Sequence, residues 1–129
     1  MNKIDLNIDI FDWTIKFFLL NKKDTNVNEI GIEYGMLEDD IAYINDKLNR
    51  KCLNGAVTLS HTDRLLTLVF IYPTSSKVEL INVLSHEIRH VVDRICQHNS
   101  IEDIETPAYM TGYITREVFR RIIIIKQKL

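Results

Sequence analysis

The chain has 129 residues, enough for one domain with a single hydrophobic core but too few for a two-lobed enzyme. Hydrophobic residues make up 46% of it and charged residues 26%, which are the proportions of an ordinary globular protein. The net charge of −2 gives no electrostatic reason to expect nucleic acid or an anionic membrane as a partner.

The N-terminal stretch and the cysteines bear on where the protein works. MNKIDLNIDIFDW is interrupted by three aspartates, so it lacks the apolar region of about 7 to 15 residues that a signal peptide needs. No segment approaches the ~18 apolar residues of a membrane span. Cys52 and Cys96 lie far apart with no C-x-x-C pairing, so we expect two buried, reduced thiols; the alternative is Cys96 as a metal ligand. The sequence therefore predicts a cytoplasmic protein.

The first half of the chain predicts two strands and a helix. Residues 3–8 alternate polar and apolar, as a half-buried strand does. Residues 12–20 are rich in β-branched and aromatic side chains and predict a second strand, followed by the polar stretch NKKDTN. Within 36–49, apolar residues recur every three or four positions, which predicts a helix. Asn54-Gly55 then marks a turn.

The second half predicts a hairpin followed by two long helices. AVTLS and RLLTLVFIY are separated by HTD and predict a β-hairpin over 56–72. The segment TSS then precedes a helix predicted for 77–97, and Asp103 or Thr106 caps another predicted for 103–126. This order predicts a single α+β domain over 1–129, with an antiparallel or mixed sheet of about four strands, two C-terminal helices and one earlier helix.

The helix predicted for 77–97 carries both an apolar stripe and a polar motif. The stripe consists of Ile81, Leu84, Ile88, Val91 and Ile95, and it would bury this helix against the sheet. Off the stripe, His86, Glu87 and His90 have the spacing H-E-x-x-H, which places the two imidazoles one above the other, able to converge on one metal ion. Glu87 is rotated by about 100° from His86, which suits it to receive a proton from water at the metal. The motif predicts a zinc site; the alternative is a solvated face with two histidines.

A catalytic zinc site needs a third protein ligand. The apolar period continues past His90 without a glycine, so the helix does not end there, and we expect His98 to be a surface residue. On the following helix, Glu105 shares a face with two small residues, which would let it approach the histidine helix closely. Glu105 is the predicted third ligand, with Glu102 as the alternative.

The motif and the segment after it resemble the gluzincin clan of zinc metallopeptidases, in which a glutamate on the following helix completes H-E-x-x-H. ELINVLSHEIRHVVD and IEDIETPAYMTGYI look like the H-E-(L/I)-R-H helix and E-x-x-A-Y segment of minigluzincins and of small zincin-like proteins from phages and prophages. The second segment also resembles the E-x-x-A-N segment of metallopeptidases that cleave phage repressors. The likeness covers roughly residues 53–115.

This resemblance implies that His86, His90 and Glu105 bind Zn²⁺ and that Glu87 is the catalytic base. The chain departs from the repressor-cleaving group at Pro107, within the ligand segment, and at Tyr109, where that group has asparagine. The substrate of that group is therefore not carried over.

Two supporting roles can also be predicted. Asp93, on the face of the two histidines, could accept the free ring N–H of one of them; the alternative is an ion pair with Arg89 or Arg94. The candidate donors to the oxyanion of a transition state are Tyr109, Tyr113 and His61.

The sequence thus predicts a zinc metallopeptidase that hydrolyses a peptide or protein substrate with Glu87 as general base. The resemblance further implies that the hairpin over 56–72 offers an edge for an extended substrate. One alternative is a non-catalytic structural or protein-binding domain, of phage origin, in which zinc joins two helices. Structural zinc sites, however, usually have four ligands and favour thiolates. The other alternative is a regulator that binds protein or DNA, and the acidic balance argues against the DNA version.

Overall fold

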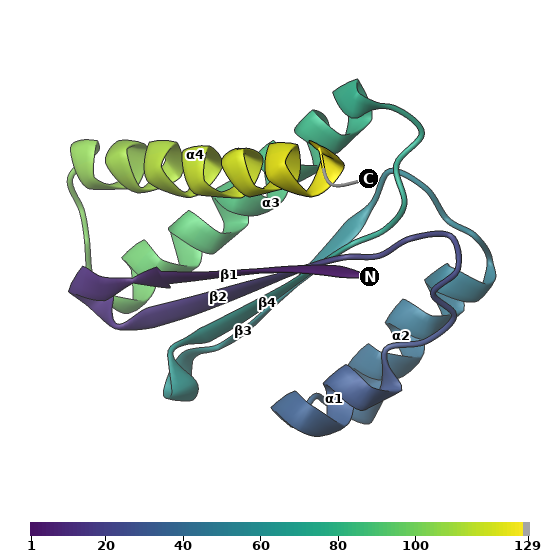
Figure 1. Ribbon diagram of the computed structural model, residues 1–129. Coiled ribbons are helices and arrows are strands. Elements are labelled where there is room, and N and C mark those ends of the chain that lie inside the picture. Colours follow the sequence, from purple (N-terminus) through teal and green to yellow (C-terminus); the bar gives the residue numbers. More distant parts are fainter. Residues whose placement is uncertain (128–129) are drawn as a thin grey trace.

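The computed structural model describes residues 1–127, with side chains to residue 124, and has an α+β fold (Figure 1). A four-stranded sheet lies between two layers of helices. On one face lie α3 (Lys77–His98) and α4 (Glu105–Gln127), and on the other lie α1 (Asn28–Tyr34) and α2 (Glu38–Asn49). Within the described residues, no helix combines the length and apolar character needed to cross a membrane.

The sheet is mixed, with strand order β1-β2-β4-β3. Its strands are β1 (Asn2–Ile8), β2 (Trp13–Leu19), β3 (Ala56–His61) and β4 (Leu66–Ile71). The pairs β1/β2 and β3/β4 are antiparallel hairpins, whereas β2 and β4 are parallel. The parallel pair arises because the chain crosses over through α1, α2 and β3 before β4 begins. As a result, β3 is an edge strand.

The burial of each strand follows its position in the sheet. Every residue of the central strand β4 is buried, since helices cover both of its faces. The edge strand β1 alternates exposed and buried residues, because α4 covers one face of it. Along β3 every residue is partly exposed, so this edge is accessible from the side.

The predicted elements agree with the structure except for one helix. Both predicted strands, the earlier helix, the hairpin and the two long helices are present, and the 3₁₀ turn Thr62–Arg64 connects β3 to β4. The prediction misses α1, whose seven residues are too few to show a helical period.

The start of each long helix is capped as the sequence predicts. The Ser76 hydroxyl accepts a hydrogen bond from the Glu79 N–H (3.1 Å), and the Asp103 carboxylate accepts one from the Thr106 N–H (2.7 Å). Four of the five residues of the predicted stripe on α3 are fully buried, but the first, Ile81, is 51% exposed. Cys96 is buried in the core beneath α3 and α4, and Cys52 is partly buried; both are free thiols.

Candidate metal centre

His86 and His90 lie side by side on the exposed face of α3. Their Nε2 atoms are 3.0 Å apart, and the two rings meet edge to face with centroids 4.6 Å apart. A tetrahedral zinc ion with Zn–N bonds of ~2.0–2.1 Å holds two nitrogens about 3.3 Å apart. The observed separation is that of a hydrogen bond between the two rings, and it is close to the spacing of two ligands of one metal ion. The i, i+4 spacing in the sequence is what brings the imidazoles together.

Glu87 has a different environment from the two histidines. One residue along a helix is a rotation of about 100°, which turns Glu87 from the exposed face toward β3. Its side chain is 9% exposed, against 66% for that of His86. The hydroxyl of Thr58, on β3, donates a hydrogen bond to Oε2, and Oε1 lies 3.9 Å from the Nε2 of His86. The carboxylate is thus held on one side, and its other oxygen faces the imidazoles across a gap that a water molecule can bridge.

A groove follows the open edge of β3, and Glu87 lies at its middle. It consists of two adjoining hollows of about 490 and 310 Å³, which share Ala56, His86 and Glu87. The larger hollow is also lined by Tyr43, Val57, Thr58, Ser60, His90 and Arg94. The smaller is also lined by Asn54, Gly55, Asn82 and Val83.

Buried hydrogen bonds fix the floor of the larger hollow. The hydroxyls of Ser60 and Thr67 are 3.0 Å apart, and Thr67 also accepts a hydrogen bond from the indole N–H of Trp13 (2.9 Å). Trp13 and Thr67 are fully buried. This chain of polar groups links Ser60, in the lining of the groove, to β4 and β2 in the centre of the sheet.

The structure does not bring Glu105 to the two histidines. Glu105 begins α4, which packs over β1, at the opposite edge of the sheet from β3. Within the part of the chain that the structure describes, no three His, Cys, Asp or Glu side chains are grouped to hold a metal ion. Neither Glu105 nor the alternative Glu102 lines the groove. The sequence prediction assumed that the close approach of the following helix would bring Glu105 beside the two histidines. In the structure α4 does pack against α3, as well as over β1, but through the hydrophobic core on the buried side of α3, away from the exposed face that carries His86 and His90.

Asp93 forms an ion pair with Arg89, which is the alternative role predicted for it from the sequence. Its carboxylate lies 2.9 Å from the Nε of Arg89, one turn earlier on the same exposed surface. Among the described residues no hydrogen bond joins Asp93 to His86 or His90. The proposed contact from Asp93 to a ligand histidine is therefore not made here.

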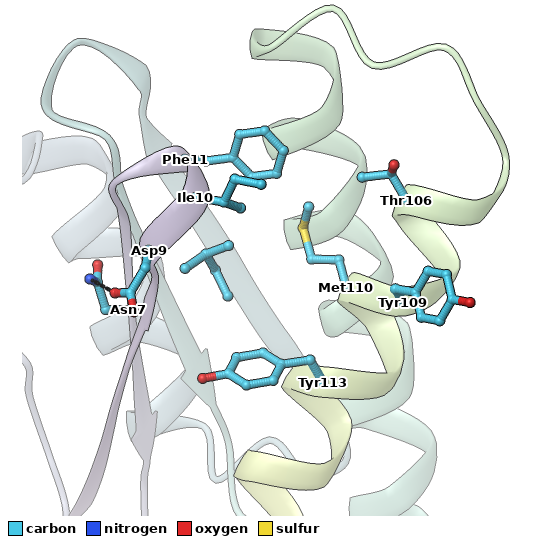
Figure 2. A pocket seen from close by; sticks show the side chains of 9 residues that line it. Asn7, Asp9, Ile10, Phe11, Thr106, Tyr109, Met110 and Tyr113 are labelled. Carbon is cyan, nitrogen blue, oxygen red and sulfur yellow. Dashed lines mark hydrogen bonds between the residues drawn. The ribbon is translucent and has the colours of Figure 1, made fainter.

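The predicted oxyanion donors also lie away from Glu87. Tyr109 and Tyr113 line a separate pocket of about 400 Å³ between α4 and the segment 7–11, where Figure 2 shows them with Met110 along the helix. His61 lies on β3 at odd spacing from Thr58, and alternate residues of a strand face opposite sides of the sheet. His61 therefore faces the side where Val57 and Leu59 pack toward α1 and α2.

Three groove residues escape the sequence prediction. Thr58 holds Glu87 from a strand 29 positions away in the sequence. Tyr43 reaches the groove from α2, on the other face of the sheet, and Arg94 lies one turn beyond His90. Arg94 could have been found, because its i+4 spacing from His90 continues the row of His86 and His90. Thr58 and Tyr43 carried no signal, since both depend on the pairing of distant elements.

Comparisons of this chain with known proteins found no related protein. No protein-family model matches the chain, and no curated protein or solved structure was found to match it. The likeness to the gluzincin clan thus remains a prediction from the motif and its flanking residues.

Proposed function

We propose that the protein is a zinc-dependent metallopeptidase that cuts an extended peptide in the groove between β3 and α3. The observation that carries this proposal is Glu87, a buried carboxylate that a hydroxyl holds in place beside two converging imidazoles. Burying a carboxylate is unfavourable unless it is hydrogen-bonded, and here the Thr58 hydroxyl engages one oxygen while the other lies 3.9 Å from the Nε2 of His86.

His86 and His90 would hold the ion, since the spacing of their nitrogens suits two ligands. When bound, zinc supplies a Lewis acid that polarises a peptide carbonyl and lowers the pKa of water. The free oxygen of Glu87 lies 3.9 Å from the Nε2 of His86, and there it would accept a proton from water and pass it to the leaving amine. Thr58 keeps that carboxylate from rotating away.

The edge of β3 is suited to bind the substrate backbone. The carbonyl of Gly55 accepts a hydrogen bond from the N–H of Tyr72, so the backbone groups of Gly55 point toward the strand that contains β4. In an antiparallel pair every second residue points toward the partner strand, so the backbone groups of Ala56, Thr58 and Ser60 point away from β4. These outward N–H and C=O groups can pair with an extended peptide by β-augmentation. The same residues line the groove, so a bound peptide would pass beside Glu87.

A second candidate function is peptide binding without hydrolysis at the same edge. It is favoured because, among the described residues, the two histidines have no third metal-ligating side chain beside them, and a catalytic zinc site usually has three protein ligands. A zinc staple between helices is a weaker candidate, because both histidines belong to α3 and a metal on them would join it to no second element.

Zinc binding is the first test. We expect His86→Ala and His90→Ala to abolish zinc uptake, measured by elemental analysis and by calorimetric titration of the metal-free protein. The geometry predicts that Glu105→Gln leaves zinc affinity unchanged, whereas the resemblance to gluzincins implies a strong loss. Full zinc uptake by either histidine variant would place the metal elsewhere and end the proposal.

Hydrolysis is the second test, and it separates the two candidate functions. The zinc-loaded protein should cut members of a peptide library, detected by mass spectrometry. Glu87→Gln should keep its zinc but lose about 10²–10⁴ in rate, as the removal of a general base typically costs. If the zinc-loaded parent cuts no peptide but still binds some of them, the binding function is the correct one.

A further inference from the structure

The groove along β3 differs in charge between its two ends. At one end, beside Ser60 and His90, it is lined by Arg94. At the other end it is lined by the neutral amides Asn54 and Asn82. Because α3 and β3 run in the same direction along the groove, these ends lie on opposite sides of Glu87.

Arg94 is available to a ligand. Within the described residues no carboxylate pairs with it, whereas Arg89 on the same helix pairs with Asp93 at 2.9 Å. The lining of the larger hollow includes one acidic side chain, Glu87, which Thr58 already engages. An anionic group that entered this end of the groove would therefore meet an uncompensated cation.

The orientation of a bound peptide follows from the pairing rules of strands. Antiparallel pairing is slightly more stable per residue than parallel pairing, so a peptide on β3 would run antiparallel to it. Its N-terminal part would then lie beside Ser60 and Arg94, and its C-terminal part beside Asn54 and Asn82. Arg94 is seven residues beyond Glu87, or about 10 Å along the helix. An extended chain covers this distance in about three residues.

We propose that Arg94 is a specificity-determining residue that selects peptides with an acidic side chain two or three residues before the bond beside Glu87. The statement that a bond is cut beside Glu87 rests on the proposed function. The preference for acidic peptides concerns binding alone and can be tested without hydrolysis. An ion pair at an exposed site changes affinity about 1.4- to fivefold, and salt should weaken it.

The experiment measures binding with the catalytic base removed. Full-length Glu87→Gln protein, loaded with zinc, is immobilised and equilibrated with a peptide mixture of random sequence, and the retained peptides are sequenced by mass spectrometry. The same is done with Arg94→Gln, Arg94→Glu and Arg89→Gln added to the Glu87→Gln background. Arg89→Gln is the matched control, because it removes an arginine of the same helix that does not line the groove.

We expect an enrichment of Asp and Glu of about 1.4- to fivefold at one position, and its loss above about 0.5 M salt. Arg94→Gln should abolish the enrichment, Arg94→Glu should replace it with enrichment of Lys and Arg, and Arg89→Gln should leave it intact. No acidic enrichment, or enrichment that survives in Arg94→Gln, would overturn the proposal.

Hydrolysis by the zinc-loaded parent distinguishes this proposal from the proposed function. If the parent cuts peptides with no acidic preference, the peptidase function stands and the role of Arg94 is wrong. If Arg94-dependent binding is found but the parent cuts nothing, the specificity stands and the peptidase function is wrong. The position of the acid relative to the cut also tests the antiparallel orientation, because an acid after the cut would indicate a parallel peptide.

Discussion

At the scale of single residues, Glu87 depends on one hydroxyl. A carboxylate with 9% of its side chain exposed loses most of its hydration, and the hydrogen bond from Thr58 compensates part of that loss. The neighbouring His86 Nε2 is 3.9 Å from Oε1, too far for a direct hydrogen bond. Thr58 is therefore a positioning residue, and its effect on chemistry would pass through Glu87.

We predict that Thr58→Val lowers the free energy of unfolding by about 1.5–3 kcal/mol, the range for a hydrogen bond to a charged group. Valine has nearly the shape of threonine, so the change removes the donor with little change in packing. Denaturant titration measures the effect, and Thr58→Ser, which keeps the hydroxyl, should retain most of the stability. If the protein hydrolyses peptides, Thr58→Val should also slow turnover, and Thr58→Ser should restore it. Equal stability of the valine variant and the parent would show that the hydroxyl contributes nothing to holding Glu87.

At the scale of elements, the start of α4 is fixed by Asp103. The hydrogen bond from the Thr106 N–H is the largest cause that lowers the pKa of this carboxyl below its ordinary value of 3.8. A carboxyl with a lowered pKa in the folded state contributes stability that is complete above its unfolded pKa and is lost as the pH falls through the folded pKa. The contribution of this cap is therefore expected to begin to fall below about pH 4 and to disappear only below the lowered pKa of the folded state.

We predict that Asp103→Asn keeps the cap but loses this part of the pH dependence, because the amide oxygen still accepts the hydrogen bond and does not titrate. Asp103→Ala should lower the thermal midpoint at neutral pH and change it less in acid. Thermal melts of the parent and both variants between about pH 3 and pH 7 measure the difference. The same fall in acid for the parent and Asp103→Asn would show that other carboxyls cause it.

At the scale of the whole molecule, the sheet separates two hydrophobic cores. The core toward α3 and α4 supports the groove, and the other core fills the space between the sheet, α1 and α2. Gly31 of α1 belongs to the second core, where a Cβ atom would come within 2.3 Å of the side chain of Ile41. An alanine at this position would force the side chain of Ile41, which is partly buried between α1 and α2, to move.

We predict that Gly31→Ala lowers the free energy of unfolding by about 1–3 kcal/mol, the usual effect of overpacking. The zinc affinity of the folded protein should not change, because the histidines lie on the other side of the sheet. Gly112→Ala is the matched control: nothing lies within 4 Å of its added Cβ, so an alanine in this helix should stabilise by about 0.5–1 kcal/mol. Denaturant titration and calorimetry of zinc binding measure both effects. A loss of zinc affinity in folded Gly31→Ala would show that the two cores are coupled.

The sequence by itself determined the local features of this protein. Three local patterns predicted the elements: the alternation in 3–8, the apolar run that becomes β4 and the stripe on α3. A strand or helix that is buried on one face shows apolar residues at its own period, and a strand that is buried on both faces is apolar throughout. The spacing of His86 and His90 determined that their nitrogens meet, since four residues are nearly one turn of a helix. The rotation of Glu87 away from them followed from the same geometry.

The tertiary structure alone decided which distant residues meet. The parallel pairing of β2 with β4 makes β3 an edge strand, and no local pattern encodes that order. It also decided that Thr58 contacts Glu87, and that α4 lies over β1, where Glu105 does not reach the histidines. Contacts between elements depend on how whole faces pack, and one amphipathic helix can pack on its neighbours in more than one arrangement. For this reason the sequence predicted the two histidines and the glutamate of the motif, and the resemblance to gluzincins implied a peptide-binding edge at the hairpin 56–72, but Thr58 and Tyr43 were not predicted to line the groove.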